Sequence, residues 1–426
     1  MYLQRRSGGV YYFRMVVPLG KRSTVGKREI CFSLNTTDRK EARLKSLPFI
    51  EKYLLDFNTT CPQDKCISVT AKMKKGIIFS EVYKKYLNER QLSESSRINF
   101  NTSVNAFIRI CGDKDIRLYT KSDIVSYKDT ILNFPLNLKE ADRTLPVEKI
   151  LIKYKDCDKK ISATTINTKY IAFISTIFRY AVINDMRTDN PCLNVKVVVG
   201  EDRTVKRLPF NIEQIQQNMF GSDLFCHTQD DRKTEYRWII LLGIYTGARM
   251  EEIVRLRTSD FGMEEGIPYA LIQPHPDEGH FLKNSGSRRR IPLHPTLWKK
   301  LELSNFISDR QNENQKYLFP VVNAGKVIAG KKGTQFSKWF ARWLDSVRLK
   351  DSALCFHSFR HTLKAWGRGS GVEIGILDAL QGHASKSVAM NYGRYIFGSP
   401  YPLKTLYEGL LKIDELNRLE PTCQTT

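Results

Sequence analysis

The stretch from Thr246 to Tyr395 carries side chains that can bind and attack a phosphate, and it restricts the fold more than any other feature. Two guanidinium groups, an amine, two imidazoles and a phenol together suit a phosphodiester that is clamped and then attacked by a side chain. The upstream members lie far from the others in sequence, so the chain has to fold back on itself to bring them together. The set comprises Arg249, Lys283, His357, Arg360, His383 and Tyr392.

The charge of the chain favours a polyanionic partner. Its 426 residues contain 68 Lys and Arg against 45 Asp and Glu, which gives a net charge of +23 and an isoelectric point near 9.6. Each phosphate that a basic side chain neutralises releases condensed counterions, so such a chain binds nucleic acid readily. No window is apolar enough to span a membrane, and the N-terminus lacks a signal peptide. We therefore expect a cytoplasmic protein without a membrane partner.

The cysteines and histidines do not predict a metal site. The nine cysteines are scattered and odd in number, which indicates reduced thiols in a cytosolic protein. Cys61 and Cys66 form a close pair, but no second pair or nearby histidine completes a zinc site. His357 and His361 have the i, i+4 spacing of zinc ligands, yet they lack the intervening Glu of metalloproteases, and Arg360 would repel a cation. His361 is therefore expected to pack or to support the site.

Residues 1–57 are predicted to form a β-β-α module. The runs VYYFRMVVP and REICFSLNT are rich in β-branched and aromatic residues around a polar loop, which is typical of a hairpin. Asp38 can cap the following helix, with Glu41 placed as in a capping box, and Pro48 can kink that helix. The module is studded with basic residues, so a DNA-contacting arm and a small packing domain with a solvated face both stay open. Residues 58–76 are polar and irregular, as in a linker.

The rest of the chain is predicted to be largely helical. Residues 77–198 contain four segments with apolar residues at helical spacing, which favours a bundle, and 135–160 is expected to be a long loop or an insertion in it. In the 205–400 segment, EYRWIILLGIYTGARMEEIVRLRTSDF predicts a helix, a Thr-Gly break and a second helix. Residues 267–293 predict short antiparallel strands around turns.

The tail, residues 401–426, is predicted to form an amphipathic helix. Its apolar residues at helical spacing could dock on a neighbouring protomer or on their own domain, and the sequence leaves both open. The fold class as a whole is mainly α with small β elements, which is an α+β protein. The apolar residues of the tail are Leu403, Leu406, Leu410 and Ile413.

Five motifs resemble those of a known family in their order and spacing. TGARMEEI, LKNSGSRRRIPLHP, HSFRHT, LQGHAS and NYGRY are similar to the motifs of the tyrosine recombinases, the phage-type integrases. The resemblance covers residues 205–396. The unit at 77–195 is similar to the family's core-binding domain, a SAM-like helical bundle, and residues 1–56 look like the N-terminal module of some integrases. The resemblance implies an enzyme that breaks and rejoins DNA through a 3′-phosphotyrosyl intermediate.

Each residue that clamps the phosphate also has a chemical reason to do so. Arg249 and Arg360 present planar forks of donors that match the non-bridging oxygens of a phosphate. His357 lies one helical turn before Arg360, so both can reach the same phosphate, and its titration range suits proton transfer. The resemblance implies that His383 donates to that phosphate and that Lys283, beside a glycine-containing turn, protonates the leaving 5′ oxygen.

Two tyrosines compete as the nucleophile. Tyr392 has the spacing from His383 that the family uses, and Tyr395 follows one helical turn later with the same bare chemistry. A phenolate that forms a covalent link stores the energy of the broken bond, so rejoining needs no ATP, metal or other cofactor. The motif spacing favours Tyr392.

Two further sets of residues are assigned supporting roles. Glu252 follows Arg249 by three residues and lies beside it on a helix, where the resemblance suggests that it orients the site; an ordinary helix salt bridge is the alternative. The triplet of Arg288, Arg289 and Arg290 could contact the DNA backbone or could be a solvated run of charge.

The function that follows is a site-specific recombinase or integrase of a mobile element or prophage. The resemblance implies double-stranded DNA as partner and a homotetramer on two DNA sites, with room for accessory DNA-bending proteins, in the cytoplasm and on the nucleoid. A catalytically silent DNA-binding regulator on the same scaffold is one alternative. A relaxing enzyme similar to type IB topoisomerases is another.

Overall fold

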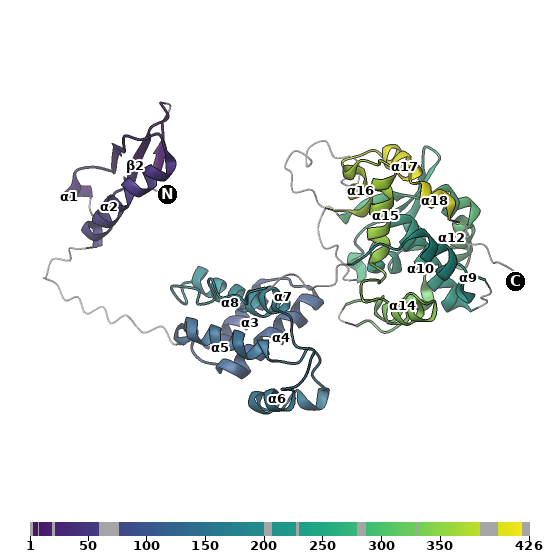
Figure 1. The fold of residues 1–426 in the computed structure, drawn as a ribbon, viewed down its shortest axis with the longest axis horizontal. Coiled ribbons are helices and arrows are strands. Elements are labelled where there is room, and N and C mark those ends of the chain that lie inside the picture. Colours follow the sequence, from purple (N-terminus) through teal and green to yellow (C-terminus); the bar gives the residue numbers. More distant parts are fainter. Residues whose placement is uncertain are drawn as a thin grey trace. The chain divides into compact units, whose positions relative to one another are not determined.

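The computed structural model describes residues 3–6, 8–18, 22–58, 76–199, 207–226, 230–278, 287–328, 330–383 and 399–419. It divides into two units, Met1–Lys75 and Gly76–Thr426 (Figure 1). The described residues form helices and two small antiparallel sheets, which confirms the α+β class. No helix among them is long and apolar enough to cross a membrane.

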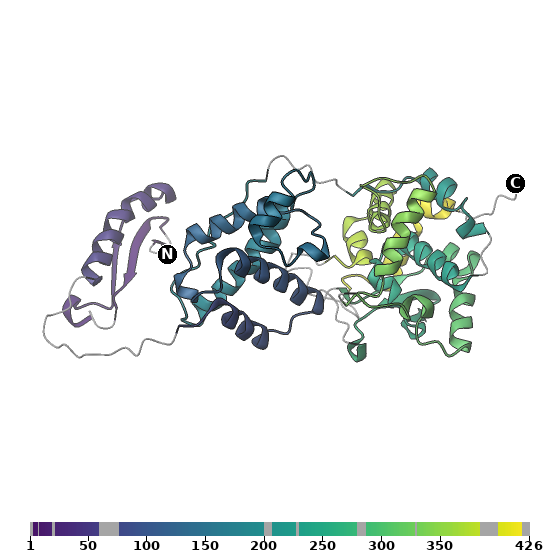
Figure 2. The same ribbon diagram turned by 90° about the horizontal axis from the view of Figure 1, so that it is seen from below.

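The N-terminal unit is a three-stranded sheet with one long helix on a single face. Strands β1 (Leu3–Arg5), β2 (Tyr11–Val16) and β3 (Glu29–Ser33) pair antiparallel in that order, and α1 (Arg22–Val25) lies between β2 and β3. The predicted hairpin is therefore β2–β3, and β1 is an additional strand. Helix α2 (Arg39–Asn58) covers the face that carries Phe13 (Figure 2).

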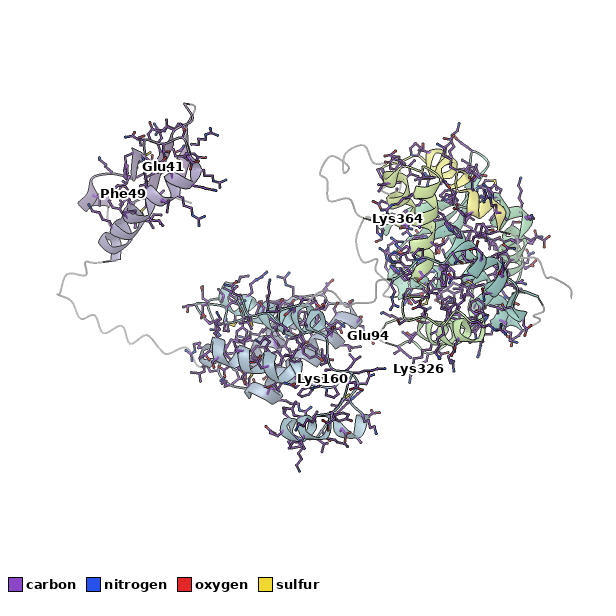
Figure 3. The ribbon with its side chains drawn as sticks, in the orientation of Figure 1. Glu41, Phe49, Glu94, Lys160, Lys326 and Lys364 are labelled. Carbon is purple, nitrogen blue, oxygen red and sulfur yellow. The ribbon has the colours of Figure 1, made fainter. Side chains whose placement is uncertain are left out.

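The start of α2 is held by Asp38 and Glu41 in a different way from the predicted capping box. Asp38 Oδ1 accepts hydrogen bonds from the backbone N–H groups of Lys40 and Glu41, both at 2.8 Å. The Glu41 carboxylate instead accepts from the hydroxyl of Thr36, so it ties the helix to the end of β3. Glu41 and Phe49 are labelled on α2 in Figure 3, and Phe49 packs edge-on against Phe32 of the sheet.

The helical unit from Gly76 to Val199 has its own core. Its long helices are α3 (Phe79–Glu89), α4 (Glu94–Cys111), α5 (Lys121–Leu132) and α8 (Ala172–Ile183). Helix α8 follows the short α7 (Ala163–Thr165) and a π-helical turn, η4 (Ile166–Ile171). Rings from α3, α4 and α8 and from the turn after η2 (Ile116–Leu118) pack together at the centre of the bundle, with centroids 4.8 to 6.0 Å apart. They belong to Phe79, Phe107, Tyr119 and Phe178.

Residues 135–160 form an ordered insertion in this bundle. Pro135 and Lys160 bridge its two ends, and it contains η3 (Glu140–Asp142) and α6 (Val147–Lys153). Asp142 accepts hydrogen bonds from Lys153 and from the hydroxyl of Tyr154, at 2.6 and 2.7 Å. A single buried carboxylate therefore orders a segment whose sequence shows little periodicity.

The third part, from Arg207 to Leu419, surrounds a buried helix. Helix α10 (Asp231–Thr246) is buried on all sides over its second half, and α15 (Ser358–Gly369) packs along it. Gly243 permits this approach, because a Cβ at that position would lie 2.7 Å from Phe356. The remaining helices are α9 (Asp223–Cys226), α11 (Met250–Val254), α12 (Leu303–Asn312), α13 (Pro320–Asn323), α14 (Thr334–Ser346), α16 (Ile374–Gln381), α17 (Leu403–Leu411) and α18 (Asp414–Arg418).

A second three-stranded sheet and the tail complete this part. Strands β4 (Phe261–Glu264), β5 (Ile267–Ile272) and β6 (Arg289–Pro292) pair antiparallel in sequence order; β5 and β6 confirm the strands predicted for residues 267–293, and β4 precedes that range. The tail forms two helices, α17 and α18, where one was expected. Helix α17 packs on its own domain against β5, β6 and α16, and α18 packs against α17 with Leu416 in the same core, so the tail lies in cis in this structure. The buried tail residues are Leu403, Leu406, Leu410, Ile413, Leu416 and Leu419.

Candidate active site

The break between α10 and α11 places Arg249. Gly247 ends α10 in the left-handed conformation, with φ at 57°, and a Cβ there would lie 2.9 Å from Leu363. Glycine therefore suits this position both for its backbone and for the space around it. Arg249 follows in an extended conformation as the N-cap of α11, with about a third of its side chain exposed.

Glu252 joins Arg249 to a second arginine, Arg289 of β6. Its carboxylate accepts from Arg249 Nη1 at 2.8 Å, from the Arg249 backbone N–H at 3.0 Å, and from Arg289 Nη2 at 2.9 Å. The Glu252 side chain is 8% exposed and that of Arg289 only 2%. Burial alone would raise the pKa of Glu252, but the charges and hydrogen bonds of Arg289 and Arg249 prevail and lower it to about 2. The carboxylate is therefore ionised at neutral pH.

Arg360 holds three segments of backbone together. Its guanidinium donates to the carbonyl of Gly247 at 3.1 Å and to the carbonyl of Gln381, the last residue of α16. The Gln381 side chain returns a hydrogen bond from Nε2 to the Arg360 carbonyl at 2.6 Å. Burial, together with the charges of Arg249 and Arg289, lowers the pKa of Arg360. The positive charges of Arg249 and Arg289 therefore act on Arg360, so the three arginines influence one another electrostatically.

His383 is placed by the left-handed end of α16. Gly382 has φ at 64°, which brings the His383 backbone N–H to 2.9 Å from the carbonyl of Asp378. The Asp378 side chain contacts the edge of the imidazole, with Oδ1 2.9 Å from Nδ1 of His383. It also accepts a hydrogen bond from Nζ of Lys364, which Figure 3 labels on α15. A Cβ on Gly382 would lie 2.7 Å from Arg289, so this turn and the Glu252 cluster are in direct contact.

His357 precedes α15 and shares the electrostatic environment of the same cluster. Burial, followed by the charges of His361, Arg360, Arg249 and His383, lowers the pKa of His357 to about 4. It is thus neutral at physiological pH. The rings of His357 and His361 meet edge-on, with centroids 5.2 Å apart. Within the described residues no three His, Cys, Asp or Glu side chains are grouped so that they could hold a metal ion.

The structure therefore brings five of the residues singled out in the sequence into one cluster. Lys283, Tyr392 and the rival Tyr395 lie outside the described residues. Sequence reasoning missed Gln381, Asp378 and Lys364, although the motif LQGHAS contains the first of them. The clustered residues are Arg249, Glu252, His357, Arg360 and His383.

The arginine triplet corrects an expectation. Arg289 and Arg290 are both buried, at 2% and 7% exposed, so neither a DNA-backbone contact nor a solvated run of charge describes them. Arg289 supports Glu252, while Arg290 pairs with Glu264 and lies over the ring of Tyr269. Arg288 alone of the three is exposed.

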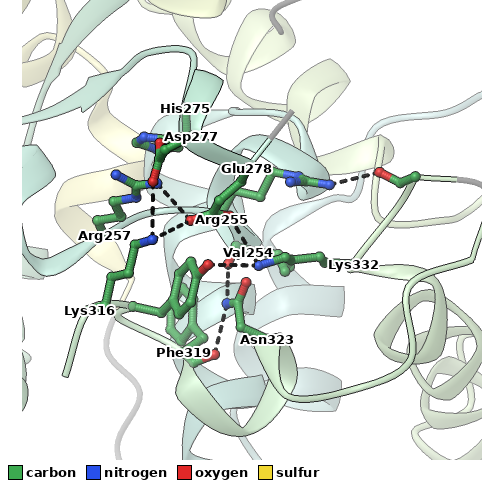
Figure 4. Close-up of polar contacts among 12 residues, drawn as sticks. Val254, Arg255, Arg257, His275, Asp277, Glu278, Lys316, Phe319, Asn323 and Lys332 are labelled. Atoms are coloured by element: carbon green, nitrogen blue, oxygen red, sulfur yellow. Dashed lines mark hydrogen bonds and ion pairs between the residues drawn. The ribbon is translucent and has the colours of Figure 1, made fainter. Parts of the chain in front are cut away.

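A second polar cluster lies beyond the end of β5, at the short turn η7 (Pro276–Glu278). Glu278 is followed in sequence by the residues that include Lys283, and its carboxylate contacts Arg257 at 2.6 Å, Lys316 at 3.0 Å and Lys332 at 3.2 Å (Figure 4). Burial would raise its pKa, but these hydrogen bonds and that of Tyr317 hold the pKa well below the usual range. The backbone N–H of Lys332 donates to Glu251 on α11 at 2.8 Å. The network therefore ties the end of β5 to the helix that Arg249 caps.

Comparisons with known proteins place parts of this chain beside two described families and one relative. Residues 213–396 match the model of the Phage integrase family, and residues 2–54 match a domain of unknown function, DUF6538. The chain is 24% identical over 293 residues to tyrosine recombinase XerC of Treponema denticola, which covers 65% of this chain and 89% of that protein.

Two solved structures share the fold. A lambda integrase dimer bound to a COC' core site has a TM-score of 0.50 at 16% identity, and the match covers 100% of this chain and 98% of that one. The Tn1549 transposon integrase in complex with circular intermediate DNA also has a TM-score of 0.50 at 16% identity, over 75% of this chain and 96% of that one.

Proposed function

We propose that the chain is a tyrosine recombinase of the phage integrase family, a DNA breaking-and-rejoining enzyme, and that it acts as a site-specific recombinase through a 3′-phosphotyrosyl intermediate. The observation that supports this proposal most directly is that Arg249, Arg360 and the turn before His383 are held together beside the buried pair of Glu252 and Arg289. That cluster is cationic and rigidly held, which is the environment that a phosphodiester under attack requires.

We propose that the arginines and histidines of the cluster clamp the scissile phosphate. Arg249 and Arg360 would donate to its non-bridging oxygens, and their charge would stabilise the negative charge that develops as the phosphorus is attacked. His383 would donate to the same phosphate through Nε2. His357, neutral at physiological pH, can accept a proton from the attacking phenol.

The bond exchange itself is assigned to two residues outside the described part of the chain. In the proposed step the phenolic oxygen of Tyr392 forms a bond to phosphorus while the bond from phosphorus to the 5′ oxygen breaks. The phenolic proton passes to His357, and Lys283 gives a proton to the leaving 5′ oxygen. Attack by a 5′-hydroxyl on the phosphotyrosyl bond reverses the step, so no ATP or metal is consumed.

We propose duplex DNA as the substrate and an assembly of protomers as the active form. The matched lambda and Tn1549 integrase structures contain DNA, and the lambda protein is a dimer on its site. Recombination of two duplexes breaks four strands, so four copies of this chain on two sites would supply the active sites. In a cell the enzyme would work in the cytoplasm on the nucleoid, on a mobile element or prophage, with accessory DNA-bending proteins where its sites lie far apart.

The N-terminal module is proposed as a second DNA-binding arm. One face of its sheet packs on α2, while the other carries Tyr12 and Arg14, with the Arg6 guanidinium 4.2 Å from the centroid of the Tyr12 ring. Arg14 pairs with Glu29 at 2.8 Å and stays about half exposed. A cationic, aromatic face on a narrow sheet fits a DNA groove. The alternative of a solvated packing domain predicts that removing residues 1–57 leaves DNA affinity unchanged.

Covalent capture tests the proposed chemistry even though the target sequence is unidentified. Sheared genomic DNA from the source organism is nicked at low density and incubated with the full chain. A phenol that attacks next to a nick loses the short 5′-hydroxyl strand, so the adduct is trapped and can be sequenced. We expect adducts with the native chain and with Tyr395→Phe, and none with Tyr392→Phe.

The other outcomes separate the alternatives. Adducts that persist in Tyr392→Phe but vanish in Tyr395→Phe would reassign the nucleophile. Tight DNA binding without any adduct would indicate a catalytically silent regulator. Relaxation of supercoiled plasmid by a monomer, without a paired site, would indicate a topoisomerase-like enzyme.

A further inference from the structure

Asp378 holds the His383 imidazole by one specific nitrogen. Its Oδ1 lies 2.9 Å from Nδ1 of His383 and also accepts from Lys364 Nζ. Burial would raise the pKa of Asp378, but the hydrogen bonds of Lys364 and His383 lower it, so the carboxylate is ionised. An ionised carboxylate can only accept, so Nδ1 of His383 carries a hydrogen. The free position of the ring is therefore Nε2.

The backbone fixes this contact as firmly as the side chains do. The left-handed Gly382 folds the chain back over the last turn of α16, and the His383 backbone N–H bonds to the carbonyl of the same Asp378. Both hydrogen bonds involve one pair of residues, so the ring cannot easily turn without breaking the end of the helix.

We propose that Asp378 is a positioning residue that aims Nε2 of His383 at the scissile phosphate and stabilises the imidazolium that forms there, with Lys364 opposing that stabilisation. The proposal rests on the proposed function, in which His383 donates to the phosphate. The charge balance is simple: on DNA binding a proton from solvent joins Nε2, while the hydrogen on Nδ1 stays with the Asp378 contact.

The charges around His383 explain why a bound phosphate would trigger this protonation. Burial lowers the pKa of His383, the Asp378 hydrogen bond raises it, and the charges of Arg360 and Lys364 lower it again. Both of these cations lie on α15, and Arg289 of the neighbouring β6 lies against the turn that precedes the ring. His357, at the start of α15, also interacts with the ring. In the DNA-free chain the ring is therefore neutral, and the negative charge of a phosphate beside it favours the imidazolium.

The first experiment needs no DNA. Histidine labelled with nitrogen-15 in the full chain shows the tautomer and the titration of each ring by NMR, and loss of one signal in His383→Gln identifies His383 among the seven histidines. We expect the native ring to be the Nδ1–H tautomer. Asp378→Asn should lower the pKa of His383 by about one unit or more, because a neighbouring opposite charge shifts a pKa by about that much. Lys364→Gln should raise it.

The second experiment uses the nicked duplex recovered by covalent capture and follows single-turnover adduct formation against pH. Since His383 has to be protonated to donate, loss of Asp378 should move the alkaline limb of the rate profile toward acid. One pKa unit corresponds to about a tenfold lower rate above that limb in Asp378→Asn. Lys364→Gln should move the limb the other way. Adding Asp378→Asn to His383→Ala should slow the reaction no further.

The outcomes keep the inference and the proposed function apart. If His383→Ala forms adducts at the native rate, the role of His383 in the proposed function is wrong. If His383→Ala is slow but Asp378→Asn keeps the native tautomer, pKa and pH profile, the positioning role is wrong. A fall in rate for Asp378→Asn that is equal at every pH, or that persists in His383→Ala, would reduce Asp378 to a structural residue.

Discussion

Replacing Glu252 by Gln removes a buried negative charge that Arg249 and Arg289 share, while the shape of the side chain is kept. Its pKa is lowered from 4.5 to about 2 in the folded chain. At about 1.36 kcal/mol for each pKa unit, that difference corresponds to about 3 kcal/mol of folding free energy. Loss of one partner of a buried ion pair costs about 3–5 kcal/mol in other proteins, which agrees with this magnitude. We therefore expect Glu252→Gln to destabilise the catalytic part by about 3 kcal/mol at pH 7.

The sign of the pH dependence follows from the direction of the pKa shift. Glu252 has a lowered pKa in the folded state, so its stabilising effect is fully present above pH 4.5 and is lost as the pH falls toward 2. The difference between the native chain and Glu252→Gln should thus stay constant from neutral pH down to about 5. By about pH 3.5 the same linkage leaves about 2 kcal/mol.

Tryptophan fluorescence during urea unfolding measures this difference in the full chain. All five tryptophans lie between Trp238 and Trp366, so the signal reports on the catalytic part alone. Glu408→Gln, at an exposed position on α17, is the matched control and should change stability by less than about 0.5 kcal/mol. A Glu252→Gln effect as small as the control, or one that grows as the pH falls, would refute the ionised, doubly paired carboxylate.

Four further substitutions, one of them a control, test the packing of the catalytic part. Gly382→Ala should lower the free energy of unfolding by about 1–2 kcal/mol because of its left-handed backbone, and by more because the new Cβ meets Arg289. Gly371→Ala is the control, since the space around its Cβ is open and only the backbone cost remains. Urea unfolding measures both. Leu410→Ala should lower stability by about 2–5 kcal/mol, independently of protein concentration if the tail packs in cis; dependence on concentration would contradict that packing. Glu278→Gln should lower the free energy of unfolding by about 1–3 kcal/mol, because it leaves half-buried cations with fewer partners. Adduct formation should also slow if the network fixes the segment after β5. An unchanged free energy of unfolding would contradict the network.

Periodicity and capping made much of the fold predictable. The segment EYRWIILLGIYTGARMEEIVRLRTSDF was expected to be a helix, a Thr-Gly break and a second helix, and it contains the end of α10, the left-handed Gly247 and α11, although α11 ends already at Val254. The pattern could not reveal β1, which is only Leu3–Arg5, or α6, which is seven residues long. Such short elements are held by tertiary contacts, here by pairing with β2 and by the hydrogen bonds to Asp142, and a local pattern carries little trace of them.

The sequence predicted which residues would contact the phosphate, but not which buried residues hold them in place. Spacing placed Glu252 beside Arg249 and His357 before Arg360, since each pair lies within one helical turn. The role of Arg289 was hidden, because a run of three arginines on a strand does not show which side chain turns inward or which carboxylate it meets. Asp378 was hidden for a similar reason. Its contact with His383 depends on the left-handed Gly382, which the motif contains but whose conformation the sequence does not state.

The net charge of the cluster explains how its buried carboxylate and its arginines would act together on a phosphate. Within the described residues, Arg249 and Arg289 donate to the carboxylate of Glu252, and Arg360 feels its charge without bonding to it, so three positive charges lie near this one negative charge. A phosphodiester brings one negative charge and therefore leaves this cluster positive. The phosphorane that forms during attack carries about two, which balances it. A cluster with that charge stabilises the transition state more than the bound substrate, which is the condition for acceleration. Glu252 has to be buried and ionised for the balance to hold, and that is why its pKa is the quantity to measure first.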